Sequence, residues 1–243
     1  MPTQLTLDSN PASITLPFVF IGTDGNDTLV GSAQGGNVIS GMGGDDSLQG
    51  VGAGNVISGG IGNDTLIGGD GGGDVMSGDA GNDYLRAGNG GGNVLSGGDG
   101  NDTLIGGSGN DVLAGGFGND QLTGGAGADA FVFNSAATGV GVDAITDFNT
   151  LEDKIRVSAS GFGLSVPQDQ STQQLLLTNQ LVLPAEQFRL GSSAATSSEH
   201  FIYNSTSGAL FFDADGVGAA AQVQIAQLSA GLALTNQNFI VIV

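Results

Sequence analysis

The stretch GNGGGNVLSGGDGNDTLIGG, residues 88–107, contains two nearly identical units. At one equivalent place in their middle, the first unit carries Asn93 and the second carries Asp102. Similar units follow one another with a period near nine, and twelve of them run from Gly22 to Val132 and hold 37 of the 46 glycines. A fixed short period over such a length predicts a solenoid.

One position of the unit indicates the secondary structure. The eighth place of the nine-residue register is apolar in all twelve units: Leu29, Ile39, Leu48, Ile57, Leu66, Met76, Leu85, Leu95, Leu104, Leu113, Leu122 and Phe131. Because side chains alternate faces along a strand, one inward residue between two outward ones predicts a three-residue strand, with the Gly-rich remainder as a turn. Two units then form one coil, and stacked coils form two parallel sheets around a thin core. A disordered Gly-rich linker, the alternative, would not keep this position apolar.

The composition points to a cation as the partner. The formal net charge is −20, from 24 acidic residues against 4 Lys and Arg, and there is no Cys. This charge argues against nucleic acid and anionic lipid, which would be repelled, and the lack of Cys excludes a disulfide or Cys-ligated metal scaffold. Crowded carboxylates and abundant glycine oppose compaction, so we expect a hard divalent ion to compensate. No stretch is long enough to span a bilayer, and the N-terminus lacks the basic region of a cleaved secretory peptide.

The sixth position of the unit divides the solenoid into two edges, because stacked turns belong to alternate units. We call one the aspartate edge; its sixth positions are Asp27, Asp46, Asp64, Asp83, Asp102 and Asp120. We call the other the mixed edge; its sixth positions are Asn37, Asn55, Asp74, Asn93, Asp111 and Asp129.

The aspartates suit calcium, which takes six to eight oxygens from carboxylates and backbone carbonyls. Glycines let a turn fold back so that its carbonyls face one point. One turn offers too few ligands, so an ion is expected to be shared by two stacked turns. This predicts about five Ca²⁺ along the aspartate edge and about one at the Asp111/Asp129 pair. Asn has no charge, and along the first four turns of the mixed edge we expect it to form a hydrogen-bonded ladder instead.

Four units carry a family resemblance: GGIGNDTLI (59–67), GGDGNDTLI (97–105), GGSGNDVLA (106–114) and GGFGNDQLT (115–123). They resemble the calcium-binding nonapeptide of the RTX family, GGxGxDxUx. The resemblance implies an all-β protein, a parallel β-roll with Ca²⁺ in its turns. It also implies secretion to the extracellular space by a bacterial type I exporter, without a cleaved N-terminal signal. The expected metal-binding residues are Asp27, Asp46, Asp64, Asp83, Asp102, Asp120, Asp111, Asp129, Gly22, Gly41, Gly59, Gly78, Gly97, Gly115, Gly62, Gly81, Gly100 and Gly118.

An apolar stripe is expected on the solvent-facing side of one sheet, formed by Val38, Val56, Val75, Val94 and Val112. Such a stripe indicates a contact surface for a protein, for a cell surface or for a second copy. Alternatively, it reflects only the preference of Val for strands.

Outside the repeats we expect an N-terminal cap strand in residues 1–21 and, after a roll over 22–132, a β-rich cap in 133–243. Phe131, Phe133 and Phe148 are expected to close the end of the core. Two interpretations fit the aspartates that follow the repeats, Asp143, Asp147 and Asp153. They form either a terminal calcium site or only structural turns and salt bridges, and the structural interpretation is favoured. The chain ends in the uncharged tail ALTNQNFIVIV. Together with the resemblance, this tail makes the last ~50 residues a candidate uncleaved export signal, although periodicity alone indicates a buried strand.

Residues 201–218 are expected to form a hairpin. Its Asp213-Ala-Asp215-Gly216 resembles the start of an EF-hand loop, but the twelfth place is Gln224 rather than Glu, so a solvated turn is favoured.

No catalytic constellation is found, since the single His is His200 and no HExxH or GxSxG motif occurs. The chain is therefore interpreted as no enzyme, but as a secreted calcium-binding protein that folds on extracellular Ca²⁺ and acts as a structural or interaction module. The alternative is a non-catalytic accessory or secretion domain of an RTX protease or lipase. An ice or crystal-surface binder is disfavoured, because the third positions of the turns are irregular.

Overall fold

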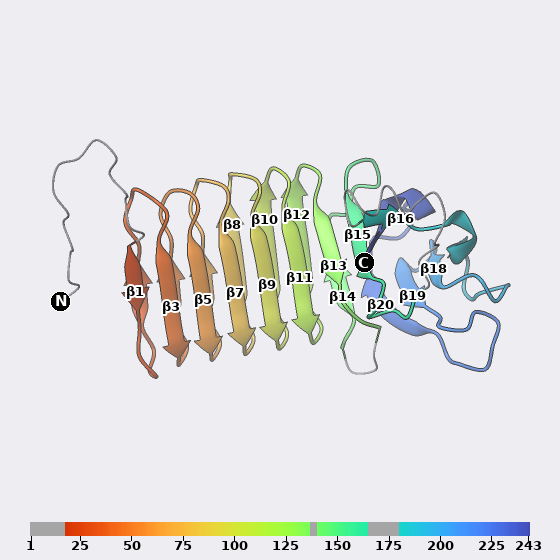
Figure 1. Ribbon diagram of the computed structural model, residues 1–243, viewed down its shortest axis with the longest axis horizontal. Helices are drawn as coiled ribbons and strands as arrows, with labels where there is room; N and C mark the ends of the chain where they lie inside the picture. Colours follow the sequence, from red (N-terminus) through yellow and green to blue (C-terminus); the bar gives the residue numbers. More distant parts are fainter. Residues whose placement is uncertain (1–17, 137–139, 165–179) are drawn as a thin grey trace.

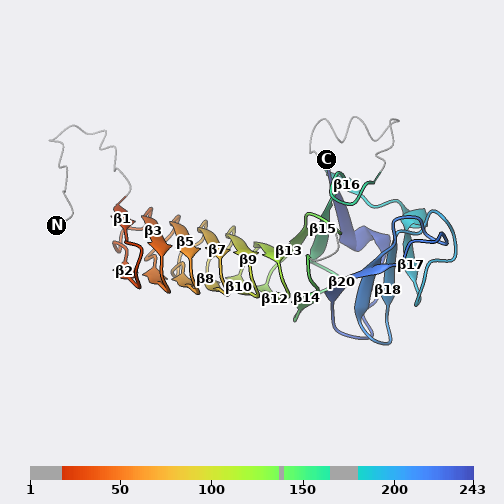
Figure 2. The same cartoon turned by 90° about the horizontal axis from the view of Figure 1, so that it is seen from below.

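The computed structural model describes residues 18–136, 140–164 and 180–243. They form two β-sheets that lie face to face along an elongated roll and continue into a thicker C-terminal part (Figures 1 and 2). The all-β parallel roll expected from the repeats is confirmed. Within the described residues, no helix is long and apolar enough to cross a membrane.

The first sheet, called sheet A, holds the strands of the mixed-edge units. In spatial order it contains β1 (Val19–Ile21), β3 (Val38–Gly43), β5 (Val56–Ile61), β7 (Val75–Ala80), β9 (Val94–Asp99), β11 (Val112–Phe117), β13 (Ala130–Phe133), β15 (Lys154–Ser158), β21 (Phe239–Ile242) and β16 (Gln180–Val182). Its strands are parallel up to β21, and β16 is antiparallel to β21.

The second sheet, called sheet B, holds the strands of the aspartate-edge units. In spatial order it contains β2 (Thr28–Val30), β4 (Ser47–Gln49), β6 (Thr65–Ile67), β8 (Tyr84–Gly88), β10 (Thr103–Ser108), β12 (Gln121–Ala126), β14 (Asp143–Ile145), β20 (Val223–Gln227), β19 (Ala209–Phe212), β18 (Phe201–Asn204) and β17 (Phe188–Leu190). Two short 3₁₀ helices, η1 (Ala185–Gln187) and η2 (Asn236–Asn238), precede β17 and β21.

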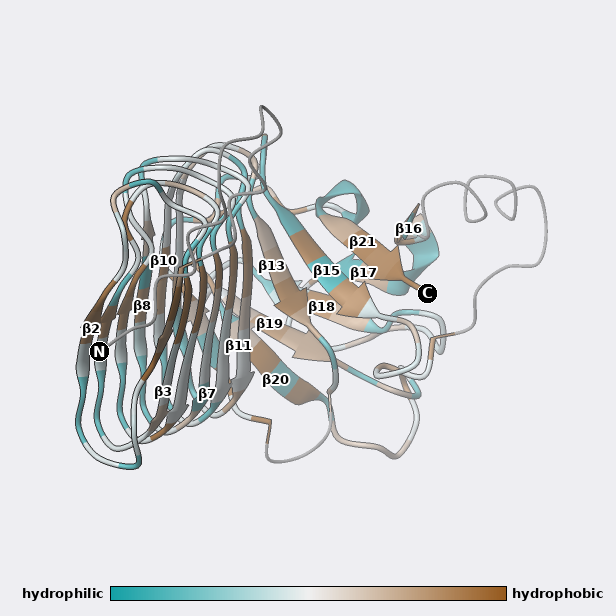
Figure 3. Cartoon of the chain, turned by 60° about the vertical axis from the view of Figure 1, so that its left-hand side comes forward, coloured by the Kyte–Doolittle hydropathy of each residue, from teal (hydrophilic) through white to brown (hydrophobic). Residues whose placement is uncertain are grey.

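Equivalent residues of successive coils stand in register. Leu104 pairs with Leu85 on one side and with Leu122 on the other. All the eighth-position residues are buried except Leu29, which is partly buried in the first coil. Figure 3 shows brown, apolar colour along the strands and teal, hydrophilic colour in the turns at both edges. The stacked apolar ladder is therefore the core of the roll.

The prediction of three-residue strands is wrong for much of the roll. Strands β3, β5, β7 and β9 to β12 are six residues long, because each continues into the glycines that begin the next unit. In β9, Leu95 and Gly97 are both buried. The first glycine of a unit is therefore a second inward position, and its missing side chain leaves room beside the turn.

The C-terminal part continues both sheets. Sheet A passes from β13 to β15 and β21, and sheet B passes from β12 to β14 and β20. Phe131, Phe133 and Phe148 are buried, and the ring centroids of Phe131 and Phe148 lie 5.9 Å apart. The expected hairpin is confirmed as the antiparallel pair β18–β19. The apolar tail forms β21, a strand between β15 and β16.

At the other end, β1 pairs with β3, with Val19 opposite Val38. The rest of the cap expected in residues 1–21 lies outside the described residues, apart from Phe18 directly before β1.

Candidate metal centre

The sixth-position aspartates of the aspartate edge form a continuous column. The backbone N–H of Asp46 donates to Oδ1 of Asp64 at 2.7 Å, and that of Asp64 donates to Oδ1 of Asp83 at 2.7 Å. The same bond joins every neighbouring pair from Asp27 to Asp120. One oxygen of each stacked carboxylate is therefore used to hold the coils together.

The second carboxylate oxygen has a different environment. In eight sixth-position aspartates, Oδ2 is buried and accepts no hydrogen bond: Asp46, Asp64, Asp74, Asp83, Asp102, Asp111, Asp120 and Asp129. Asp27, in the first turn, is only partly buried, and its Oδ2 accepts from the backbone N–H of Thr23 at 2.6 Å and from the Oγ1 of Thr23 at 2.9 Å. A buried carboxylate oxygen without a donor is costly, so these eight atoms require a partner.

The space beside these oxygens is bordered by a second acceptor. A Cβ placed on Gly106 would lie 2.8 Å from Oδ2 of Asp111 and 2.7 Å from the carbonyl oxygen of Gly124. The same pair, an Oδ2 of the glycine's own unit and a carbonyl oxygen of the next coil, borders the first glycines of four aspartate-edge units: Gly41, Gly59, Gly78 and Gly97. Two acceptor oxygens that face one position suit a cation with oxygen ligands, so the residues present fit Ca²⁺.

The glycines at the fourth position of the aspartate-edge units allow the stacked turns to approach one another closely. Gly62, Gly81, Gly100 and Gly118 all have positive φ, between 121° and 138°. A Cβ on Gly81 would overlap the carbonyl group of Gly62 in the turn below. These glycines let stacked turns approach closely, and a ligand role for their carbonyls stays a prediction.

Burial raises the pKa of the column carboxyls from Asp64 to Asp120. The pKa of Asp83 rises to about 6 and that of Asp102 to about 7, chiefly because burial removes water from the charged form and further because neighbouring aspartates repel it. On the mixed edge burial raises the pKa of Asp129 to about 6. Without a cation, the column therefore resists full ionisation near neutral pH.

The mixed edge has the same ladder of backbone hydrogen bonds, but here asparagine side chains also donate to the next sixth-position residue. Asn37 donates from Nδ2 to Oδ1 of Asn55 at 2.6 Å, as the predicted ladder requires. Asn55 and Asn93 donate from Nδ2 to Oδ1 of Asp74 and Asp111, both at 2.9 Å. The ladder therefore includes the aspartates of this edge.

Two aspartates beyond the repeats extend the columns. The N–H of Asp120 donates to Oδ1 of Asp143 at 3.2 Å, and that of Asp129 donates to Oδ1 of Asp153 at 2.9 Å. The pKa of Asp143 rises to about 8, through burial and the charge of Asp120. Asp147 instead accepts from the N–H groups of Gly124 and Gly125, which is a structural role. The spacing Asp-x-Ile in 143–145 and 153–155, which matches Asp-x-Leu of the repeats, was the available signal for Asp143 and Asp153.

No group of three or more Asp, Glu, His or Cys side chains surrounds one point among the described residues. Each proposed position instead combines few carboxylates with backbone carbonyls.

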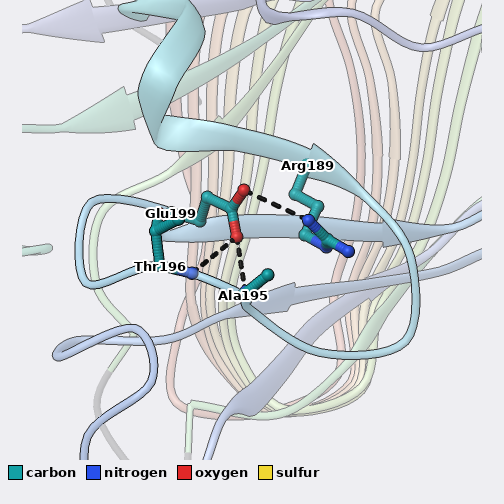
Figure 4. A network of polar contacts seen from close by, with 4 residues as sticks. All are labelled: Arg189, Ala195, Thr196 and Glu199. Carbon is teal, nitrogen blue, oxygen red and sulfur yellow. Dashed lines mark hydrogen bonds and ion pairs between the residues drawn. The ribbon is translucent and has the colours of Figure 1, made fainter.

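The C-terminal part has its own polar contacts. Figure 4 shows Glu199 in an ion pair with Arg189 at 3.3 Å, while its second oxygen accepts from the N–H groups of Ala195 and Thr196. His200 contacts the carbonyl oxygen of Asp213 through Nδ1 at 2.8 Å. The prediction of a solvated turn is wrong for Asp213, which is buried because its backbone pairs with His200, and right for Asp215, which is exposed.

Comparisons with known proteins agree with this geometry. The family described as RTX calcium-binding nonapeptide repeat (4 copies) matches residues 21–51, 33–66, 49–85, 68–91, 87–122 and 96–131. No curated protein matches the chain. Among solved structures, the chain is similar to the AlgE6R3 subunit from the Azotobacter vinelandii mannuronan C5-epimerase, with 20% sequence identity over 98% of this chain and 85% of that chain. Its TM-score is 0.25, so no argument rests on this likeness.

Proposed function

Since residues 21–131 belong to the RTX calcium-binding nonapeptide repeats, we propose that this chain is a secreted protein whose roll folds as it binds extracellular Ca²⁺. Once folded, it serves as a structural or interaction module. The observation that carries this proposal is the set of eight buried Oδ2 atoms without a donor. A bound Ca²⁺ supplies the positive charge and the oxygen coordination that these atoms lack.

The chain contributes to this switch through its own stacking. A turn presents one Oδ2, and the next coil presents the carbonyl that borders it, as Gly124 does for Asp111. Both oxygens meet only when the coils are stacked, so binding and folding are linked. Each independent site adds RT ln(1 + [L]/Kd) to the stability, and about five coupled positions on the aspartate edge make folding steep in calcium.

Export is expected to depend on the same link between calcium binding and folding. In a calcium-poor cytosol, unneutralised carboxylates keep the chain unfolded and suitable for a type I exporter; outside the cell, the roll forms. We propose the C-terminal region 133–243 as the part that carries the uncleaved export signal.

The interaction surface that we propose is the apolar stripe on sheet A. Val56, Val75 and Val94 are 47%, 46% and 42% exposed, and Val38 and Val112 at the ends of the stripe are partly buried. Neighbouring Val side chains stand opposite each other in register. Replacing Val56, Val75 and Val94 by Ser is expected to preserve the fold and to weaken capture of the partner or self-association.

The proposal gives the chain no catalytic role, because the family comparison identifies only calcium-binding repeats. The alternative hypothesis is that the chain is a non-catalytic accessory or secretion domain of an RTX enzyme. Co-purification with a catalytic chain would favour this hypothesis.

Circular dichroism during a calcium titration tests the proposed function. We expect little strand signal in calcium-free buffer and a steep rise on adding Ca²⁺, with no comparable rise on adding Mg²⁺, which prefers a stricter octahedral geometry. A full strand signal in calcium-free buffer at neutral pH would refute the switch.

A further inference from the structure

Three asparagines occupy the sixth position on the mixed edge, and all three are fully buried: Asn37, Asn55 and Asn93. The Nδ2 of each asparagine donates hydrogen bonds to two kinds of acceptor. The first is Oδ1 of the next sixth-position residue, as described above. The second is a turn carbonyl: Asn37 donates to Ser32 at 3.1 Å, Asn55 donates to Gly68 at 3.0 Å, and Asn93 donates to Gly90. Among the described residues, no asparagine side-chain atom at this position is buried without a partner.

An amide and a carboxylate can be compared at the same place on this edge. A Cβ on Gly50 would lie 2.8 Å from Nδ2 of Asn55 and would overlap the carbonyl oxygen of Gly68. A Cβ on Gly106 would lie 2.8 Å from Oδ2 of Asp111 and 2.7 Å from the carbonyl oxygen of Gly124. The Nδ2 of Asn55 therefore lies where the Oδ2 of Asp111 lies, and each faces the carbonyl of the first glycine of the mixed-edge unit in the next coil.

The chemistry of the two atoms is opposite. Nδ2 carries hydrogens and can donate to the carbonyl directly, whereas a carboxylate oxygen and a carbonyl oxygen are both acceptors. Only a cation or a proton can therefore join the carboxylate oxygen to the carbonyl oxygen.

We propose that Asn37, Asn55 and Asn93 replace calcium on the mixed edge, so that this edge closes without the ion from Asn37 to Asn93. Calcium is then needed on this edge only where Asp111, Asp129 and Asp153 follow one another. Asp74 lies between Asn55 and Asn93 in the ladder, so it has no neighbouring carboxylate with which to share an ion, and a proton on its Oδ2 joins it to the bordering carbonyl of Ala87 instead. This inference rests on the proposed function, because it assumes that the Oδ2 atoms elsewhere bind Ca²⁺.

The test is a gain of binding. Asn93→Asp in the full chain places a carboxylate next to both Asp74 and Asp111, and with one ion shared by each neighbouring pair we expect about two additional Ca²⁺ per chain by equilibrium dialysis with elemental analysis. The matched control is Asp102→Asn in the same coil on the aspartate edge, which breaks two such pairs and is expected to lose about two Ca²⁺. Asn55→Asp, which joins residue 55 to Asp74, is a second variant in case Asn93→Asp does not fold. Folding of every variant in calcium is checked by circular dichroism.

The outcomes separate the two claims. If the unmodified chain binds no Ca²⁺, the proposed function fails. If it binds Ca²⁺, and the folded Asn→Asp variants bind no more than it does, the replacement of calcium by asparagine is refuted. A gain in Asn93→Asp or Asn55→Asp together with a loss in Asp102→Asn supports the inference.

Discussion

On the aspartate edge, every turn from Asp46 to Asp120 buries a carboxylate oxygen that has no donor, whereas Asn37, Asn55 and Asn93 on the mixed edge donate to the carbonyls around them. The same coils and the same backbone ladder support both edges. The difference therefore lies in one side-chain atom, nitrogen or oxygen, at the sixth position. Within one roll, this atom determines whether a turn closes by itself or depends on a cation.

Single glycines of the roll differ in how closely the stacked turn approaches them. Gly81 on the aspartate edge has φ 138°, and a Cβ there would overlap the backbone of Gly62. Gly92 on the mixed edge has φ 81°, and a Cβ there would meet nothing within 4 Å.

The largest effect is therefore expected for Gly81→Ala, with Gly92→Ala as its matched control. Gly81→Ala should cost at least about 3 kcal/mol of unfolding free energy, because backbone must move. Gly92→Ala should cost roughly 1–2 kcal/mol, the penalty of the left-handed conformation alone. Urea denaturation in saturating calcium measures both; equal losses would contradict the close approach of the Gly62 backbone to Gly81.

Acid should partly substitute for calcium, mainly on the aspartate edge. The pKa of Asp102 rises from an ordinary 3.8 to about 7 and that of Asp143 to about 8, so the folded metal-free chain holds protons that the unfolded chain has released. Its stability is then lost as the pH rises through about 8, and it is regained on acidification toward the ordinary value. Asn93 does not titrate and contributes nothing to this change.

Circular dichroism in calcium-free buffer, with calcium removed by a chelating resin, checks this pH dependence of the metal-free fold. Strand signal should be larger at pH about 5 than at pH about 8. In saturating calcium the trend should reverse, because protons compete with the ion for the same carboxylates. A metal-free chain that is equally or better folded at the higher pH would contradict the account.

The smallest effect is expected for Asp74→Asn, which makes the sixth positions asparagine from residue 37 to residue 93. The new amide can donate to the carbonyl of Ala87, which borders the Oδ2 of Asp74. The free energy of unfolding in calcium-free buffer should rise by about 1 kcal/mol, with the number of bound ions unchanged. Loss of a Ca²⁺ from this variant would show that Asp74 binds the ion and would shorten the calcium-free part of the mixed edge.

The roll was largely predictable from its sequence, because its contacts recur at one spacing. The alternation of Leu or Ile with turn glycines determines which side chains face inward, and the period determines which sixth positions stack. Strand length was not predictable in the same way, because the buried first glycines, such as Gly97, have no side chain to give a periodic apolar signal.

Beyond Val132 the period is lost, and long-range pairing takes over. Asp143 stacks on Asp120 across 23 residues and Asp153 on Asp129 across 24, in place of 18 or 19 within the repeats. Strand β21 pairs with β15 from the far end of the chain. Such contacts depend on the fold of the intervening segments, which no local pattern of residues specifies.

The division between the edges is tested most directly by locating the ions in crystals grown with calcium, using its anomalous scattering. The account predicts a column of peaks along the aspartate edge. On the mixed edge it predicts peaks only among Asp111, Asp129 and Asp153, with none from Asn37 to Asn93. Equal columns of ions along both edges would contradict it.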